Sequence, residues 1–161
     1  MKVYLRNWQR GSIVPFLLGV VLGSCAPDEI CFSDNTSLVQ LEFLTILYEG
    51  TDSAEVVNDT LIFNSITAQA TDSVFVEGDT LAKLALPVNT ADTVTWFLFD
   101  SDRGMDSLQL SYRVFRRLIS EECGPEQIFD ELNPGSTSFD SVVIIAPLLN
   151  QQIVKNVEVY Y

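Results

Sequence analysis

Three carboxylates stand close together in the segment Asp100-Ser101-Asp102-Arg103-Gly104-Met105-Asp106. Calcium prefers several hard oxygen ligands, so Asp100, Asp102 and Asp106 form a weak candidate calcium site. The spacing departs from the EF-hand loop, because Ser111 stands at the twelfth position, where that loop has a glutamate. We therefore expect a polar turn between two strands and predict no metal ion here.

Four other side chains offer binding chemistry in an otherwise acidic chain. Arg113, Arg116 and Arg117 are a basic cluster whose planar guanidinium groups suit a carboxylate or a phosphate. Pairing with the acids of the protein itself is the alternative. Trp96 would stack on a sugar ring if it is exposed, whereas core packing is the other possibility. These four residues are the candidate ligand-binding residues.

Catalytic chemistry finds little support in the sequence. The chain has no histidine, which removes the commonest general base and the commonest metal ligand. It also lacks a G-x-S-x-G elbow, an HExxH motif and a P-loop. Carboxylate pairs are abundant in so acidic a chain, so they indicate no glycosidase by themselves. We predict that the protein is not an enzyme and uses no cofactor.

The N-terminal 24 residues have the organisation of an export signal. Residues 1–10 are basic, and residues 11–24 are uncharged and mostly apolar, a stretch that is short for a membrane span. Leu22-Gly23-Ser24-Cys25 resembles the bacterial lipobox, in which small residues precede a cysteine that receives a diacylglyceryl group. We predict a lipoprotein signal peptide over 1–24 and lipidation of Cys25. An uncleaved anchor or an ordinary signal peptide is the alternative.

Residues 25–36 are predicted to be a lipidated tether. The early Asp28-Glu29 pair resembles the acidic signal that sends some Bacteroidota lipoproteins to the cell surface, and a solvated linker is the alternative. We expect an outer-membrane lipoprotein, on the periplasmic face or the cell surface. Lipid on Cys25 is enough for stable anchoring, because a bacterial lipoprotein carries more than one acyl chain.

Cys31 and Cys123 remain once Cys25 is assigned to lipid. An exported chain meets an oxidising compartment, so we expect a disulfide between them. Two free buried thiols are the main alternative, and a metal site is weaker because no CxxC motif and no histidine accompany them. A bridge requires Cα atoms about 4.4–6.8 Å apart, which places the tether beside the end of a distant strand.

Composition and patterning predict an all-β domain over residues 37–161. The net charge is −13, and without the basic leader it becomes −16, because only six of the nine basic residues then face 22 acids. Such a surface repels nucleic acid. Short β-favouring runs between turn signals predict an antiparallel, immunoglobulin-like β-sandwich of seven to eight strands, with a closed barrel as the alternative. The predicted strands are Leu38–Tyr48, Thr60–Phe63 with an extension to Ala68 as the alternative, Ser73–Val76, Thr80–Leu86, Thr93–Phe99, Ser107–Ile119, Ser141–Ala146 and Ile153–Tyr160.

Two local features complete this prediction. Glu77-Gly78-Asp79 is expected to be a short hairpin turn, because glycine tolerates the backbone angles of such turns. Pro125–Leu132 is the one segment with a helical pattern, with proline in its first turn and Ile128, Phe129 and Leu132 on one side. Asn133-Pro134-Gly135-Ser136 is expected to end that helix.

The chain also resembles an uncharacterised family of Bacteroidota lipoproteins, catalogued as domain of unknown function 6452. The order of several weak motifs carries this resemblance. It implies a secreted lipoprotein with two pairing cysteines and no assigned activity. The motifs are Cys25 with Asp28-Glu29-Ile30-Cys31, Leu84-Ala85-Leu86-Pro87-Val88-Asn89-Thr90, Asp106-Ser107-Leu108-Gln109-Leu110-Ser111-Tyr112, Glu122-Cys123-Gly124 and Ile153-Val154-Lys155-Asn156-Val157-Glu158-Val159.

The functional prediction is a membrane-anchored, non-enzymatic lipoprotein that serves as a structural or interaction module. A glycan- or small-ligand-binding surface lipoprotein is the alternative. The expected partners are the membrane, through Cys25, and an unidentified protein or glycan. An exposed Trp96 beside a groove would favour the alternative.

Overall fold

The computed structural model describes residues 31, 33–49, 53–69, 71 and 73–161, which form ten strands and no helix. The all-β class is therefore confirmed, with more strands than the seven or eight expected. The strands are β1 (Leu38–Glu49), β2 (Ser53–Asn58), β3 (Leu61–Ala68), β4 (Val74–Leu81), β5 (Lys83–Pro87), β6 (Val94–Ser101), β7 (Gly104–Ser120), β8 (Gly124–Thr137), β9 (Ser141–Ile144) and β10 (Val157–Tyr160).

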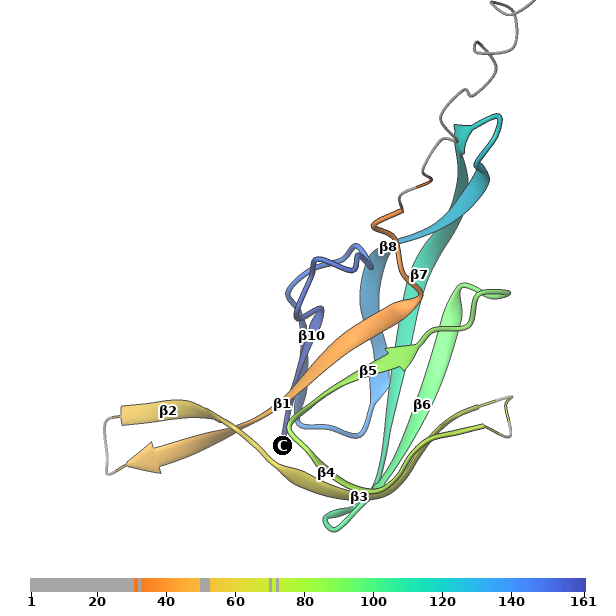
Figure 1. The fold of residues 1–161 in the computed structure, drawn as a ribbon. Helices are drawn as coiled ribbons and strands as arrows, with labels where there is room; N and C mark the ends of the chain where they lie inside the picture. The colour runs from red at the N-terminus through yellow and green to blue at the C-terminus, as the bar shows by residue number, and fades with distance from the viewer. Residues whose placement is uncertain (1–30, 32, 50–52, 70, 72) are drawn as a thin grey trace, which may run out of the picture. The chain divides into compact units, whose positions relative to one another are not determined.

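The strands form two five-stranded sheets (Figure 1). In the first, β1 is central, with β10 parallel on one side and β2 and β5 antiparallel along the other. β9 extends this sheet beyond β10. The second sheet is antiparallel in the order β4-β3-β6-β7-β8. The chain passes from the first sheet to the second between β2 and β3, and returns between β4 and β5.

One hydrophobic core takes side chains from both sheets. Phe43 of β1 packs against Phe63 of β3 and Phe99 of β6, with ring centroids 5.2 and 5.9 Å apart. Each phenylalanine is fully buried, and burial of such a side chain contributes about 1.5–3 kcal/mol. Leu108 and Leu110 of β7 also point into this core. Residues two apart on a strand lie on the same face, so their period-2 spacing predicts this.

The predicted helix over Pro125–Leu132 is wrong, because β8 runs through it from Gly124 to Thr137. Phe129 and Leu132 are both buried although they stand three residues apart, which a regular strand does not allow on one face. The strand register shifts between them and Glu131 adopts φ 55°, so a bulge returns Leu132 to the inner face. Buried residues three positions apart are also typical of a helix, which is why the sequence indicated one here.

The two prolines of β8 fit its position in the sheet. Pro125 and Pro134 lie in an edge strand, which pairs with β7 alone in the sheet. Proline lacks an N–H donor, so it is tolerated at an edge where that donor is not required for pairing. For the same reason, the expected break at 133–136 is absent and the strand continues.

The expected hairpin turn at Glu77-Gly78-Asp79 is also wrong. β4 continues through Gly78, which has φ 65°, and pairs along its length with β3. The change of direction comes at Ala82, where the chain leaves one sheet for the other. The last strand is shorter than predicted, since β10 begins at Val157.

Candidate functional site

An open pocket of about 530 Å³ lies where the β3–β4 and β5–β6 connections meet the start of β6. Its volume is within the range of small-molecule sites in proteins. Apolar contacts come from Phe75 of β4 and from Pro87 and Val88 at the end of β5, while Trp96 lines it from β6. The segment 88–93 supplies part of its polar wall, through Asn89, Thr90 and Asp92.

A ring of buried hydrogen bonds fixes that segment. The hydroxyl of Tyr112 on β7 donates to the carbonyl of Asn89 at 2.7 Å, and its oxygen lies 2.7 Å from Thr95 Oγ1. The Asn89 N–H donates to the same Thr95 oxygen at 2.7 Å. Burial is the main cause that raises the pKa of Tyr112, so its hydroxyl remains a donor at neutral pH. The loop is therefore preformed.

Two further contacts hold the loop from outside the ring. The backbone N–H of Val88 donates to the Ser37 carbonyl at 2.8 Å. The side-chain amide of Gln127 on β8 donates to the Thr90 carbonyl at 3.1 Å. The segment is thus attached to four strands or their flanks, which fixes this wall of the pocket.

Trp96 is partly exposed and faces away from the core. Burial alternates along β6, so Thr95 and Phe97 point inward and Trp96 lies on the opposite face. The register puts Gln109 of β7 directly opposite Trp96, and the Gln69 N–H donates to the Trp96 carbonyl at 2.8 Å. Gln109 is therefore the cross-strand neighbour of the indole on the outer face of the sheet.

The lining of the pocket is polar but nearly uncharged. Asn89 and Asp92 use one side-chain oxygen each to accept from the N–H groups of Ala91 and Thr93, at 3.0 and 2.7 Å. The amide nitrogen of Asn89 and the second oxygen of Asp92 make no bond to another described residue. Among the described lining residues, Asp92 is the one ionisable group. This chemistry suits hydroxyl groups better than an anion.

The candidate arginines lie elsewhere, on the far part of the β7–β8 hairpin. Arg113 forms ion pairs with Asp130 at 3.5 Å and Glu131 at 2.9 Å. Arg117 bonds Glu126. Two of the three arginines are therefore paired with acids of the protein itself, and the structure does not bring them to Trp96. Arg116 is exposed and has no ion-pair partner among the described residues.

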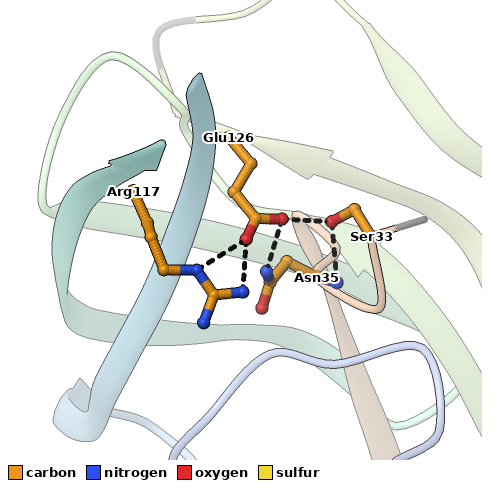
Figure 2. A network of polar contacts seen from close by, with 4 residues as sticks. All are labelled: Ser33, Asn35, Arg117 and Glu126. Atoms are coloured by element: carbon orange, nitrogen blue, oxygen red, sulfur yellow. Dashed lines mark hydrogen bonds and ion pairs between the residues drawn. The ribbon is translucent and has the colours of Figure 1, made fainter. Parts of the chain in front are cut away.

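Figure 2 shows that Glu126 collects three donors from distant parts of the chain. Ser33 Oγ and Asn35 Nδ2 donate to Oε2 at 2.5 and 2.8 Å, and Arg117 Nε donates to Oε1 at 3.0 Å. These bonds lower the pKa of Glu126, and the bonds from Ser33 and Asn35 contribute most. The carboxylate thus fastens the start of the described chain to the hairpin.

The predicted cysteine pair is confirmed at the same end of the hairpin. Cys31 and Cys123 form a disulfide with Cα atoms 5.6 Å apart. The neighbouring contacts of Ser33 and Asn35 with β8 extend this attachment. Cys25, the predicted lipidation site, lies outside the described residues. In the part of the chain that is described, no helix has the length and hydropathy needed to cross a membrane.

The acidic loop is a tight turn between β6 and β7, as expected. Its three carboxylates each bond a different partner: Asp100 accepts from Asn64, Asp102 from the Ile62 N–H and Asp106 from Ser138. The described residues contain no group of three or more acids or cysteines placed to hold a metal ion.

Comparison with known proteins places residues 63–161 in a family described as of unknown function, DUF6452. The chain belongs to this family. No curated protein and no solved structure matches the chain. The DUF6452 region includes the described pocket residues, Tyr112 and Cys123, whereas Cys25, Cys31 and β1 precede it. It is therefore shorter than the resemblance found in the sequence, which began at Cys25.

Sequence reasoning selected Trp96 but missed the residues that shape its surroundings. Tyr112 and Asn89 were identified only as parts of family motifs. Glu126 was placed in a helix and given no role. A buried tyrosine that ends an apolar alternation is a usable signal, because its hydroxyl needs a partner. That partner stands 23 residues away in sequence, so no local pattern reveals it.

Proposed function

We propose that this protein is a lipid-anchored, non-enzymatic binding module that takes an uncharged, hydroxylated ligand, such as a glycan, beside Trp96. The observation that carries the proposal is a partly exposed tryptophan that lines a preformed pocket of about 530 Å³. A flat surface would have favoured the structural or interaction module that the sequence suggested first. The pocket favours the ligand-binding alternative.

The chemistry of the lining supports this ligand class. An indole offers a flat apolar face to the C–H groups of a sugar ring, while amides and a carboxylate bond its hydroxyls. Gln69, Asn89 and Asp92 supply such groups around Trp96. No cation is present among the described lining residues, and the chain carries a net charge of −13, so an anionic ligand is disfavoured.

The proposed setting is the outer membrane of a member of the Bacteroidota. The basic leader, its short apolar core and the Leu22-Gly23-Ser24-Cys25 motif support a signal peptide over 1–24 and a lipid on Cys25. We further propose an immunoglobulin-like sandwich for the domain. Two mostly antiparallel sheets that share one core support that arrangement.

Tryptophan fluorescence can test this proposal. Trp96 is the only tryptophan in residues 25–161, since the other is Trp8. Its fluorescence therefore reports on this pocket alone in the mature lipoprotein. Titration with a panel of neutral and acidic oligosaccharides is expected to change the emission for neutral members, with saturation.

Calorimetry then tests the role of the indole. Trp96→Ala is expected to weaken binding at least tenfold, because loss of about 1.4 kcal/mol or more of stacking energy corresponds to that factor. Tyr48→Ala is the matched control, since Tyr48 is an aromatic residue of β1 that is 76% exposed and does not line the pocket. Equal affinities of Trp96→Ala and wild type, or no binding by any neutral member of the panel, would contradict the proposal.

A further inference from the structure

Three large apolar side chains are exposed near the turn of the β7–β8 hairpin. Leu118 is 62% exposed, and Phe115 and Ile119 are each 38% exposed. They lie within five positions of one another on β7, and their alternation presents apolar groups on both faces of the two-stranded ribbon. Apolar groups clustered in this way indicate an interaction surface.

The disulfide determines what lies nearest to this surface. Cys123 directly precedes β8 at the turn of the hairpin and is bonded to Cys31. Cys31 stands six residues after Cys25, the proposed lipidation site, and six residues of fully extended chain reach at most about 20 Å. The hairpin turn is therefore held within that distance of any bilayer that contains the lipid.

We infer that the end of the β7–β8 hairpin lies in the interfacial layer of the bilayer that holds the lipid of this protein, with Phe115, Leu118 and Ile119 against the acyl boundary. This inference rests on the lipid anchor of the proposed function. It adds an orientation: the disulfide end of the domain faces the membrane. The free end of the β1–β2 ribbon then points away, because Figure 1 shows it far from the hairpin turn.

The charges around the turn set the depth of this contact. Arg113 and Arg117 are paired with Asp130, Glu131 and Glu126, so these acids carry little free charge. Exposed Arg116 remains available to lipid phosphates, which a guanidinium bonds well.

Two exposed acids, Glu121 and Glu122, occupy the turn itself. Carboxylates do not enter the hydrocarbon region, but they are compatible with the ammonium groups of phosphatidylethanolamine. The contact is therefore interfacial, with the turn at the level of the headgroups and the apolar side chains of β7 beside it.

Fluorescence quenching in vesicles tests the orientation. The full lipidated protein carries Trp96→Phe in every case, together with L118W in one sample and Y48W in a control sample. Each is reconstituted into vesicles of phosphatidylethanolamine and phosphatidylglycerol whose acyl chains carry bromine, which quenches indoles at short range. The indole of L118W is expected to be quenched several-fold more strongly than that of Y48W. Both sites are exposed on strands, so both variants are expected to fold.

A third sample combines L118W with Cys31→Ser and Cys123→Ser, and it is expected to lose part of the quenching because the turn is released from the tether. Flotation of the vesicles and mass spectrometry of the anchor are measured first. Protein that lacks the acyl mass and does not float would overturn the lipid anchor itself. Protein that floats with its lipid, yet shows equal quenching of L118W and Y48W, would leave the anchor standing and overturn the orientation.

Discussion

Single hydroxyl and carboxyl groups decide how this domain holds its loops. The Tyr112 hydroxyl is placed by strand alternation, since β7 turns every second side chain inward. At the end of the apolar run it meets the Asn89 carbonyl and the Thr95 hydroxyl, and so fixes the loop that walls the pocket. Glu126 does the same for the start of the chain by accepting from Ser33 and Asn35.

Tyr112→Phe tests the first of these roles. The substitution keeps the ring, which packs on Phe129 at 5.9 Å, but removes the hydroxyl. Buried groups then lose a partner, which costs about 1–3 kcal/mol. We expect a loss of that size in urea unfolding, together with a shift in Trp96 emission as the loop loosens. Tyr160→Phe is the control, because its hydroxyl bonds Glu158 outside the pocket. An equal effect of both variants would argue against a specific role for Tyr112.

At the scale of elements, the β7–β8 hairpin connects several parts of the chain that are distant in sequence. It pairs with β6 on one side. On the other side, the Leu132 N–H of β8 donates to the Pro147 carbonyl, and the Leu149 N–H donates to the Phe129 carbonyl of β8. The turn of the hairpin carries the disulfide to Cys31. The hairpin therefore joins the start of the described chain, the pocket loop and the late strands.

Removal of the disulfide with Cys31→Ser plus Cys123→Ser tests how much of this depends on the covalent bond. The bridge joins positions 92 residues apart, so it restricts a long loop of the unfolded chain. A loss of unfolding free energy on the order of 2–5 kcal/mol is expected. Urea unfolding of the double variant and of wild type with a reductant should agree. An unchanged midpoint in both would show that Glu126 and its partners suffice to hold the tether.

Much of this element plan could be predicted from the sequence, because strands with one buried face show it directly. The regions of β1, β3, β6 and β7 were found through their apolar runs and alternation. The cysteine pair was found through the chemistry of an exported chain. Trp96 was found because an indole, if exposed, can stack on a sugar ring.

The remaining features depend on contacts that local patterns do not encode. β2 is a mostly exposed edge strand whose pairing with β1 makes it a strand. The bulge at Glu131 gives β8 a helical spacing of buried residues. Gly78 stays inside β4 because β3 pairs with β4 on both sides of the glycine. This pairing overrides the preference of Glu77-Gly78-Asp79 for a turn. The pocket itself arises from segments between positions 68 and 96 that only the fold brings together.

At the scale of the whole molecule, charge and attachment act together. The domain is strongly acidic, and such a charge repels anionic lipids over most of its surface. The β7–β8 turn differs, with exposed apolar groups and Arg116 beside the tether. The proposed lipid on Cys25 would therefore bring the membrane to an end of the domain where Arg116 and exposed apolar groups accompany the acids Glu121 and Glu122.

Cys25→Ser tests that attachment. Without the thiol no diacylglyceryl group is transferred, so the signal peptidase for lipoproteins has no substrate and residues 1–24 are expected to remain. Metabolic labelling with a fatty acid should mark wild type and leave Cys25→Ser unlabelled, with a larger intact mass for the variant.

Cys31→Ser is the matched control for this experiment, because it removes a cysteine of the disulfide and keeps Cys25. It is expected to be labelled and processed like wild type while it loses stability. The pairing of Cys31 with Cys123 leaves the described domain independent of Cys25, so the domain of Cys25→Ser should still form its disulfide. A Cys25→Ser protein that is cleaved normally and still incorporates the fatty acid would show that another residue carries the anchor.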